Sequence, residues 1–137
     1  LGSGLFDFRM IEKAKVRWAL GSDIGGGPFL SMFDVMRSFV DQNTEKGIKE
    51  ATFVKALYRA TLAGAEIMGV DKKTANLSPG KEANFLVVPL KGLRKLNAEK
   101  TLEAIVTPHS ISRESYEELV NLVTWRGNVL HNSGILS

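Results

Sequence analysis

Cysteine is absent from the 137 residues of the chain, so disulfides and cysteine-based metal sites are excluded. This absence leaves the cellular compartment open, and the cytoplasm is the default expectation. The sequence also lacks any apolar run near the roughly eighteen residues that a membrane-spanning helix needs. We therefore expect no contact with a membrane and a site built from side chains other than cysteine.

Neither sign of charge is in large excess. The 18 lysines and arginines outnumber the 15 aspartates and glutamates, which gives a formal net charge of +3. The basic residues are scattered apart from the segment 91–100, which we interpret as solvated surface. This distribution does not favour nucleic-acid binding. The hydrophobic content of 44% suits a globular chain with a core of its own.

One stretch of the chain, residues 16–28, has the pattern of a functional site. Its mainly apolar beginning, residues 16–20, is too short for a helix and predicts a buried strand. Asp23 would lie just past the carboxyl end of that strand, where α/β proteins build their active sites. Three consecutive glycines follow, namely Gly25, Gly26 and Gly27. Because glycine lets a backbone turn sharply and approach a ligand, the stretch predicts a site around Asp23.

The residues alone leave the role of Asp23 open. Aspartate often caps a turn, and Asp23 precedes a turn-forming sequence. A carboxylate at a strand end can also bind a metal or transfer protons. The three glycines match a phosphate-binding loop poorly, because no lysine followed by serine or threonine comes after them.

Hydrophobic periodicity and turn signals predict the other elements. Helices are expected over 6–15, from Pro28 to about 43, over 49–68 and over 97–106. Further strands are expected over 85–88, 119–125 and 129–131. Phe6 and Met10 would share one apolar face of the first helix. Gly69 is the expected terminator of the third helix, and Asn97 the expected cap of the fourth.

Four blocks of sequence occur in an order that matches one known group of enzymes. They are LGSG at 1–4, GSDIGGGPFLSMFDVMR at 21–37, ATLAGA at 60–65 followed by Met68-Gly69, and GKEANF at 80–85. Together they resemble the C-terminal segment of amidohydrolase-superfamily enzymes, most closely the guanine deaminases. The resemblance covers nearly the whole chain.

The resemblance implies an α/β fold that combines parts of two domains. Residues 1–70 would form the C-terminal end of a metal-dependent-hydrolase TIM (β/α)8 barrel, with its last βα portion and C-terminal helices. Residues 71–137 would form the C-terminal part of a small accessory β-sandwich. The partners of the expected strand at 16–20 would then come from a missing N-terminal part of the barrel. We therefore expect this chain to be the tail of something larger.

The resemblance also implies a role for the predicted site. Asp23 would bind the active-site metal, a divalent ion such as zinc or iron, and relay protons. Gly25, Gly26 and Gly27 would shape the pocket wall. The histidine ligands that the family draws from earlier strands are absent here, and His109 and His131 do not replace them. Because a catalytic zinc takes three or more protein ligands, we expect this chain alone to bind no metal and to be inactive.

The implied activity of the complete protein is hydrolysis of a purine, guanine, to xanthine and ammonia, by an enzyme that forms a homodimer. Two alternatives stay open. The first is another amidohydrolase that acts on a different purine, a pyrimidine or a triazine-type ring. The second is a non-catalytic binding or structural module whose glycine-rich turn meets an anion or a partner protein.

Overall fold

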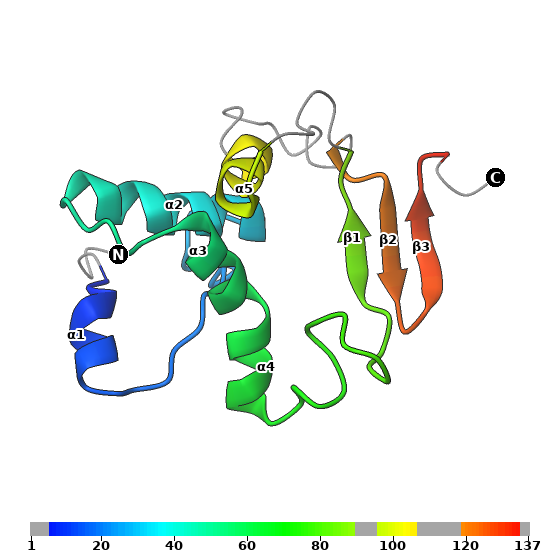
Figure 1. The fold of residues 1–137 in the computed structure, drawn as a ribbon, viewed down its shortest axis with the longest axis horizontal. Helices are drawn as coiled ribbons and strands as arrows, with labels where there is room; N and C mark the ends of the chain where they lie inside the picture. Colours follow the sequence, from blue (N-terminus) through cyan, green and yellow to red (C-terminus); the bar gives the residue numbers. More distant parts are fainter. Residues whose placement is uncertain (1–5, 90–95, 107–118, 135–137) are drawn as a thin grey trace. The chain divides into compact units, whose positions relative to one another are not determined.

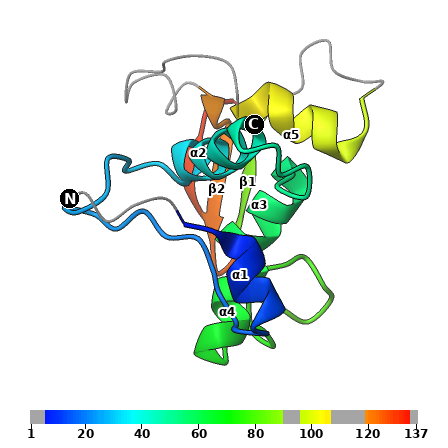
Figure 2. The same ribbon diagram turned by 90° about the vertical axis from the view of Figure 1, so that its left-hand side faces the viewer.

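The computed structural model describes residues 6–89, 96–106 and 119–134 (Figures 1 and 2). The chain divides into two compact units, with the boundary between Gly69 and Val70. Among the described residues, the first unit is helical, and the second contains a small antiparallel sheet and the helix Ala98–Val106. The block at 1–4, residues 91–95 of the basic segment and His109 lie outside the described residues.

The described residues of the first unit form four helices: α1 (Phe8–Lys13), α2 (Met32–Glu45), α3 (Phe53–Ala60) and α4 (Leu62–Met68). Polar residues cap the first three. The side chains of Asp7, Ser31 and Thr52 accept hydrogen bonds from backbone N–H groups in the first turn of α1, α2 and α3. The expected helices over 6–15 and after Pro28 are confirmed with shifted ends.

Residues 16–20 do not form the expected strand. A strand needs a neighbour to receive its backbone hydrogen bonds, and the described part of this unit contains no other strand. The backbone bonds of the segment go to helices instead. Val16 N–H donates to the carbonyl of Ile11 at 3.1 Å, and Leu20 N–H donates to the carbonyl of Arg59 at 2.9 Å. The strand prediction is therefore wrong for this structure.

The single helix expected over 49–68 is two helices that meet at Thr61. This residue has φ −129° and ψ −90°, which lies outside the helical region. Its hydroxyl donates to the carbonyl of Leu57 at 2.7 Å, so a side-chain bond accompanies the break. The expected end of the second helix is confirmed, because Gly69 caps α4 with a φ of +71°.

The core of the first unit is a cluster of aromatic rings. Phe8, Trp18 and Phe39 are at most 7% exposed, and their ring centroids lie 5.3 to 5.9 Å apart. Phe8, and not Met10, is the residue of α1 that enters this core, since Met10 is 66% exposed. The apolar face predicted from Phe6 and Met10 is therefore not the one that packs into the core, because a helix of six residues has too few turns for periodicity to orient it.

The second unit contains β1 (Phe85–Val87), α5 (Ala98–Val106), β2 (Leu122–Trp125) and β3 (Asn128–Asn132). The sheet is antiparallel in the order β1-β2-β3, with Leu86 opposite Val123 and Val123 opposite His131. The three strand predictions are confirmed in type, although β2 begins later than expected. All five residues of β3 are exposed, His131 included.

One local prediction for the second unit, the cap at Asn97, is confirmed. Asn97 caps α5, because its side-chain oxygen accepts from Lys100 N–H at 2.9 Å. Arg126 and Gly127 form the turn between β2 and β3, both with positive φ, as two-residue hairpin loops require. Among the residues that the structure describes, no helix is long and apolar enough to cross a membrane.

A hydrogen bond between α3 and α4 supports a prediction about pH. The hydroxyl of Tyr58 donates to Oε2 of Glu66 at 2.6 Å. This bond, followed by partial burial, raises the pKa of Tyr58 above its ordinary value. A raised pKa in the folded state means that the contribution to stability is present below about pH 10 and is lost as pH rises through the folded pKa.

Replacing Tyr58 with phenylalanine is therefore expected to lower the free energy of unfolding of the complete protein below about pH 10. The loss should be under about 1 kcal/mol, because the pair is exposed to solvent. Above about pH 10, the free energy of unfolding of the variant should fall less steeply with pH than that of the wild type. Chemical denaturation over a pH series measures both effects, and identical profiles for variant and wild type would contradict the assignment.

Candidate functional site

Asp23 lies in a tight turn between the segment 16–22 and α2. Its backbone carbonyl accepts two hydrogen bonds, from Gly26 N–H at 2.9 Å and from Gly27 N–H at 2.6 Å. The residue itself has a φ of +49°, in the left-handed region that aspartate tolerates better than most residues. The backbone of Asp23 therefore closes the turn, and its carboxylate is left for other contacts.

Two of the glycines after Asp23 lie so close to neighbouring atoms that a side chain would collide with them. A Cβ atom at Gly26 would lie 2.6 Å from Oδ2 of Asp23, and one at Gly27 would lie 2.3 Å from the carbonyl oxygen of Ser22. Gly25 has open space around it but a φ of +97°, which favours glycine. The sequence of three glycines thus serves one geometry, in which the loop folds back against the Asp23 carboxylate.

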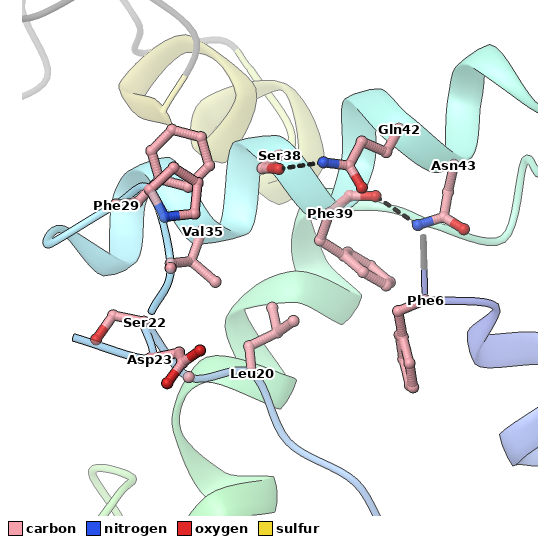
Figure 3. A pocket seen from close by; sticks show the side chains of 13 residues that line it. Phe6, Leu20, Ser22, Asp23, Phe29, Val35, Ser38, Phe39, Gln42 and Asn43 are labelled. Atoms are coloured by element: carbon pink, nitrogen blue, oxygen red, sulfur yellow. Dashed lines mark hydrogen bonds between the residues drawn. The ribbon is translucent and has the colours of Figure 1, made fainter. Parts of the chain in front are cut away.

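A cavity of about 310 Å³ lies beside this turn, against α2 (Figure 3). This volume is at the small end of the range for small-molecule sites. Its apolar lining is formed by Phe6, Leu20, Pro28, Phe29, Val35 and Phe39. The polar side chains on its wall are those of Ser22, Asp23, Ser38, Gln42 and Asn43.

The predicted site residues take different places around this cavity. Asp23 and Gly27 line it, whereas Gly25 and Gly26 are not among its lining residues. Gly26 lies next to the Asp23 carboxylate, which lines the cavity. A metal-binding and catalytic role for Asp23, and a pocket-wall role for the three glycines, stay predictions.

Sequence reasoning did not single out the polar residues that α2 contributes. Gln42 Nε2 donates to Oγ of Ser38 at 2.8 Å, and Asn43 Nδ2 donates to the carbonyl of Phe39 at 2.7 Å (Figure 3). Asn43 is only 4% exposed, and its Oδ1 has no hydrogen-bond partner in the described structure. The signal was available in the four-residue spacing of Ser38 and Gln42, which places them on one side of the helix.

The donor set for a metal is incomplete in the described part of the chain. Within residues 6–89, 96–106 and 119–134, no three histidine, cysteine, aspartate or glutamate side chains are grouped to hold an ion. The Asp23 carboxylate has the right chemistry for one ligand of zinc or iron, but a catalytic zinc needs about three from protein. The described residues therefore cannot complete the coordination of a metal ion by themselves.

Comparison with known proteins gives consistent matches. The Amidohydrolase family model matches residues 1–122. Guanine deaminase of Escherichia coli (strain K12) is 34% identical over 110 residues, covering 77% of this chain and 25% of that protein. Guanine deaminase of Mus musculus is 33% identical over 93 residues, covering 64% of this chain and 20% of that protein. The chain spans a quarter or less of the length of these relatives.

Solved structures are similar as well. The structure titled E. coli guanine deaminase superposes with a TM-score of 0.78 at 27% identity, covering 98% of this chain and 31% of that one. The guanine deaminase from Bradyrhizobium japonicum gives a TM-score of 0.62 at 22% identity, covering 97% of this chain and 35% of that one. The second likeness shows a shared fold alone.

Proposed function

Since the chain belongs to the amidohydrolase family, we propose that it is the C-terminal portion of a guanine deaminase, which converts guanine and water to xanthine and ammonia. The observation that carries this proposal is the Asp23 carboxylate, which a glycine-rich turn holds beside a cavity. The named relatives support guanine as the substrate, because each of those compared above is a guanine deaminase. The purine would be the small-molecule partner of the complete protein.

We also propose the architecture that the sequence predicts. Residues 1–70 would complete the (β/α)8 barrel of the enzyme, and residues 71–137 would contribute to its accessory β-sandwich. The likeness to the E. coli structure supports this, because it extends over 98% of the chain and only 31% of that structure. The remaining elements of the barrel, and the second subunit of a homodimer, would complete the protein.

The chemistry proposed for Asp23 follows from its place at the cavity. In the complete protein, Asp23 would be one of several residues that hold a divalent metal, zinc or iron, and the chemistry of such a metal would be the activation of water. The Asp23 carboxylate would accept a proton from the water that attacks the ring carbon bearing the amino group. The same proton would then pass to the departing amino group, which leaves as ammonia.

The turn around Asp23 suits this task. General acid–base catalysis depends on a proton acceptor held within hydrogen-bond reach of the water. The backbone bonds to Gly26 and Gly27 fix the main chain of Asp23 without using its carboxylate. The apolar wall formed by residues such as Phe29 and Phe39 would limit the access of other water. We propose that the glycine turn is part of the substrate pocket.

The test is an assay of the complete protein and of this chain alone. The complete, metal-loaded protein is expected to release ammonia and xanthine from guanine. The 137-residue chain is expected to release neither, even with added zinc or iron, because Asp23 supplies only one ligand. Turnover of adenine, cytosine or a triazine in place of guanine would favour a different substrate. Inactivity of the complete protein on every ring would favour a binding module.

A further inference from the structure

We propose that Arg59 is a positioning residue that fixes the segment carrying Asp23, an inference that rests on the function proposed above. Within the described residues, groups on the neighbouring helices hold the backbone of the segment 16–23 by hydrogen bonds. Arg59 of α3 does so twice. Its Nη1 donates to the carbonyl of Trp18 at 3.1 Å, a side-chain bond that a substitution removes. Its backbone carbonyl accepts from Leu20 N–H at 2.9 Å, a bond that any residue at position 59 keeps.

The guanidinium of Arg59 also holds the side chain of Trp18. Its central carbon lies 4.1 Å from the centroid of the indole ring, in cation–π contact. The other rings of the aromatic core pack against the same indole. Trp18 is therefore held at its carbonyl and at its ring, with little freedom for the residues that follow.

These contacts are close to the candidate site. Leu20, whose N–H is bound by Arg59, lines the cavity together with Asp23 (Figure 3). Only Gly21 and Ser22 separate the two in sequence, and both also line the cavity. A shift of Trp18 would thus be transmitted through Leu20 to the start of the turn that carries Asp23.

Glu12 of α1 fixes the orientation of the guanidinium. Arg59 Nη2 lies 3.0 Å from Oε1 of Glu12, and the Arg59 side chain is only 17% exposed. The planar fork of arginine directs separate N–H groups to Glu12 and to the Trp18 carbonyl while its face stacks on the indole. Lysine has no such fork, so it is expected to reproduce only part of this arrangement.

Lys55 provides a matched comparison on the same helix. It lies one turn before Arg59, is 3.3 Å from Oε2 of Glu12 and covers the ring of Phe8 at 4.7 Å. Among the described contacts, none joins its side chain to the segment 16–23. A loss of Lys55 removes a cation from Glu12 and packing from the core, but leaves the segment's own hydrogen bonds in place.

The experiment uses the complete enzyme with three substitutions: Arg59→Met, Arg59→Lys and Lys55→Met. Steady-state kinetics on guanine, metal content and amide hydrogen exchange of peptides that cover 18–27 are measured for each. Arg59→Met is expected to lower kcat about ten- to hundredfold with KM nearly unchanged and metal retained, since small misplacements of catalytic groups have effects of this size. Exchange should become faster in 18–27 than in α2. Arg59→Lys should recover part of kcat and part of the protection from exchange in 18–27. Lys55→Met should have the kcat and the exchange of the wild type.

Opposite results would overturn the proposal. Arg59→Met with wild-type kcat, or with exchange raised equally throughout the first unit, would show a role in stability alone. An equal loss of kcat in Lys55→Met would also show that Arg59 acts through stability alone. If Arg59→Met does not fold, the graded kinetics and exchange of Arg59→Lys decide. If the wild type does not deaminate guanine, the proposed function fails, and the exchange data alone support or overturn the positioning role.

Discussion

Replacing Asp23 with asparagine is expected to remove the activity of the complete enzyme while leaving its fold intact. The amide is nearly the same size as the carboxylate and can still offer one oxygen to a metal, but it cannot accept the proton of the attacking water. General acid–base catalysis contributes on the order of a hundred- to ten-thousand-fold, and kcat should fall by that amount. Measurement of kcat for folded, metal-loaded enzyme tests this.

The structure predicts that this substitution preserves the turn. The turn is closed by the backbone carbonyl of Asp23, which asparagine also has. Asparagine tolerates the φ of +49° at this position as well as aspartate does. The free energy of unfolding should therefore stay close to that of the wild type. If Asp23 acted only as a cap, the variant would keep both its stability and its rate, because asparagine caps about as well as aspartate.

Asp41→Asn is the matched control for the loss of one negative charge. Asp41 is an exposed residue on α2, outside the lining of the cavity, so its substitution should leave kcat unchanged. Metal content must be measured beside kinetics, because weaker metal binding would also lower the rate. A folded and metal-loaded Asp23→Asn enzyme with nearly normal kcat would contradict the catalytic assignment.

The sequence predicted the parts of the fold that depend on local patterns. The amphipathic spacing of α2, the Asn97 cap and the Gly69 terminator each require only a few neighbouring residues, and all three are confirmed. Residues 16–20 show the limit of this reasoning. Their composition predicts a strand, yet a strand also needs a neighbour, and the described residues of the first unit supply none.

Only the part of the candidate site that is local in sequence could be predicted. Asp23 and its glycines are adjacent in sequence, so their pattern is visible without a structure. Arg59 is 36 residues away from Asp23 in numbering and reaches the same segment through α3, a contact that no spacing rule predicts. Its pairing with Glu12 spans 47 residues. Long-range contacts of this kind come from packing, and packing was the information that the sequence did not contain.

The glycine turn yields the other prediction with a large expected effect, because its two last glycines should respond differently to a methyl group. At Gly26, the added Cβ would meet the tip of the Asp23 side chain, with Oδ2 at 2.6 Å. A side-chain tip can rotate away, so the backbone and the stability of Gly26→Ala should change little. The carboxylate would lose its position, and kcat is expected to fall about ten- to hundredfold.

At Gly27, the added Cβ would meet backbone, since the carbonyl oxygen of Ser22 lies 2.3 Å away. The main chain would have to move, and overpacking of this kind costs typically about 1 to 3 kcal/mol. Gly27→Ala is therefore expected to lower both kcat and the free energy of unfolding. Gly21→Ala is the stability control, because no atom lies within 4 Å of its added Cβ.

Denaturation and steady-state kinetics of the three alanine variants separate the two effects. The expected pattern is a loss of rate alone at Gly26, a loss of rate and stability at Gly27, and wild-type stability at Gly21. Wild-type kcat in Gly26→Ala would mean that the Asp23 carboxylate can move without consequence, which would contradict its role in proton transfer. Wild-type stability in Gly27→Ala would contradict the close approach of the turn to Ser22. The distinction depends on what each methyl group meets, a movable carboxylate in one case and a fixed carbonyl in the other.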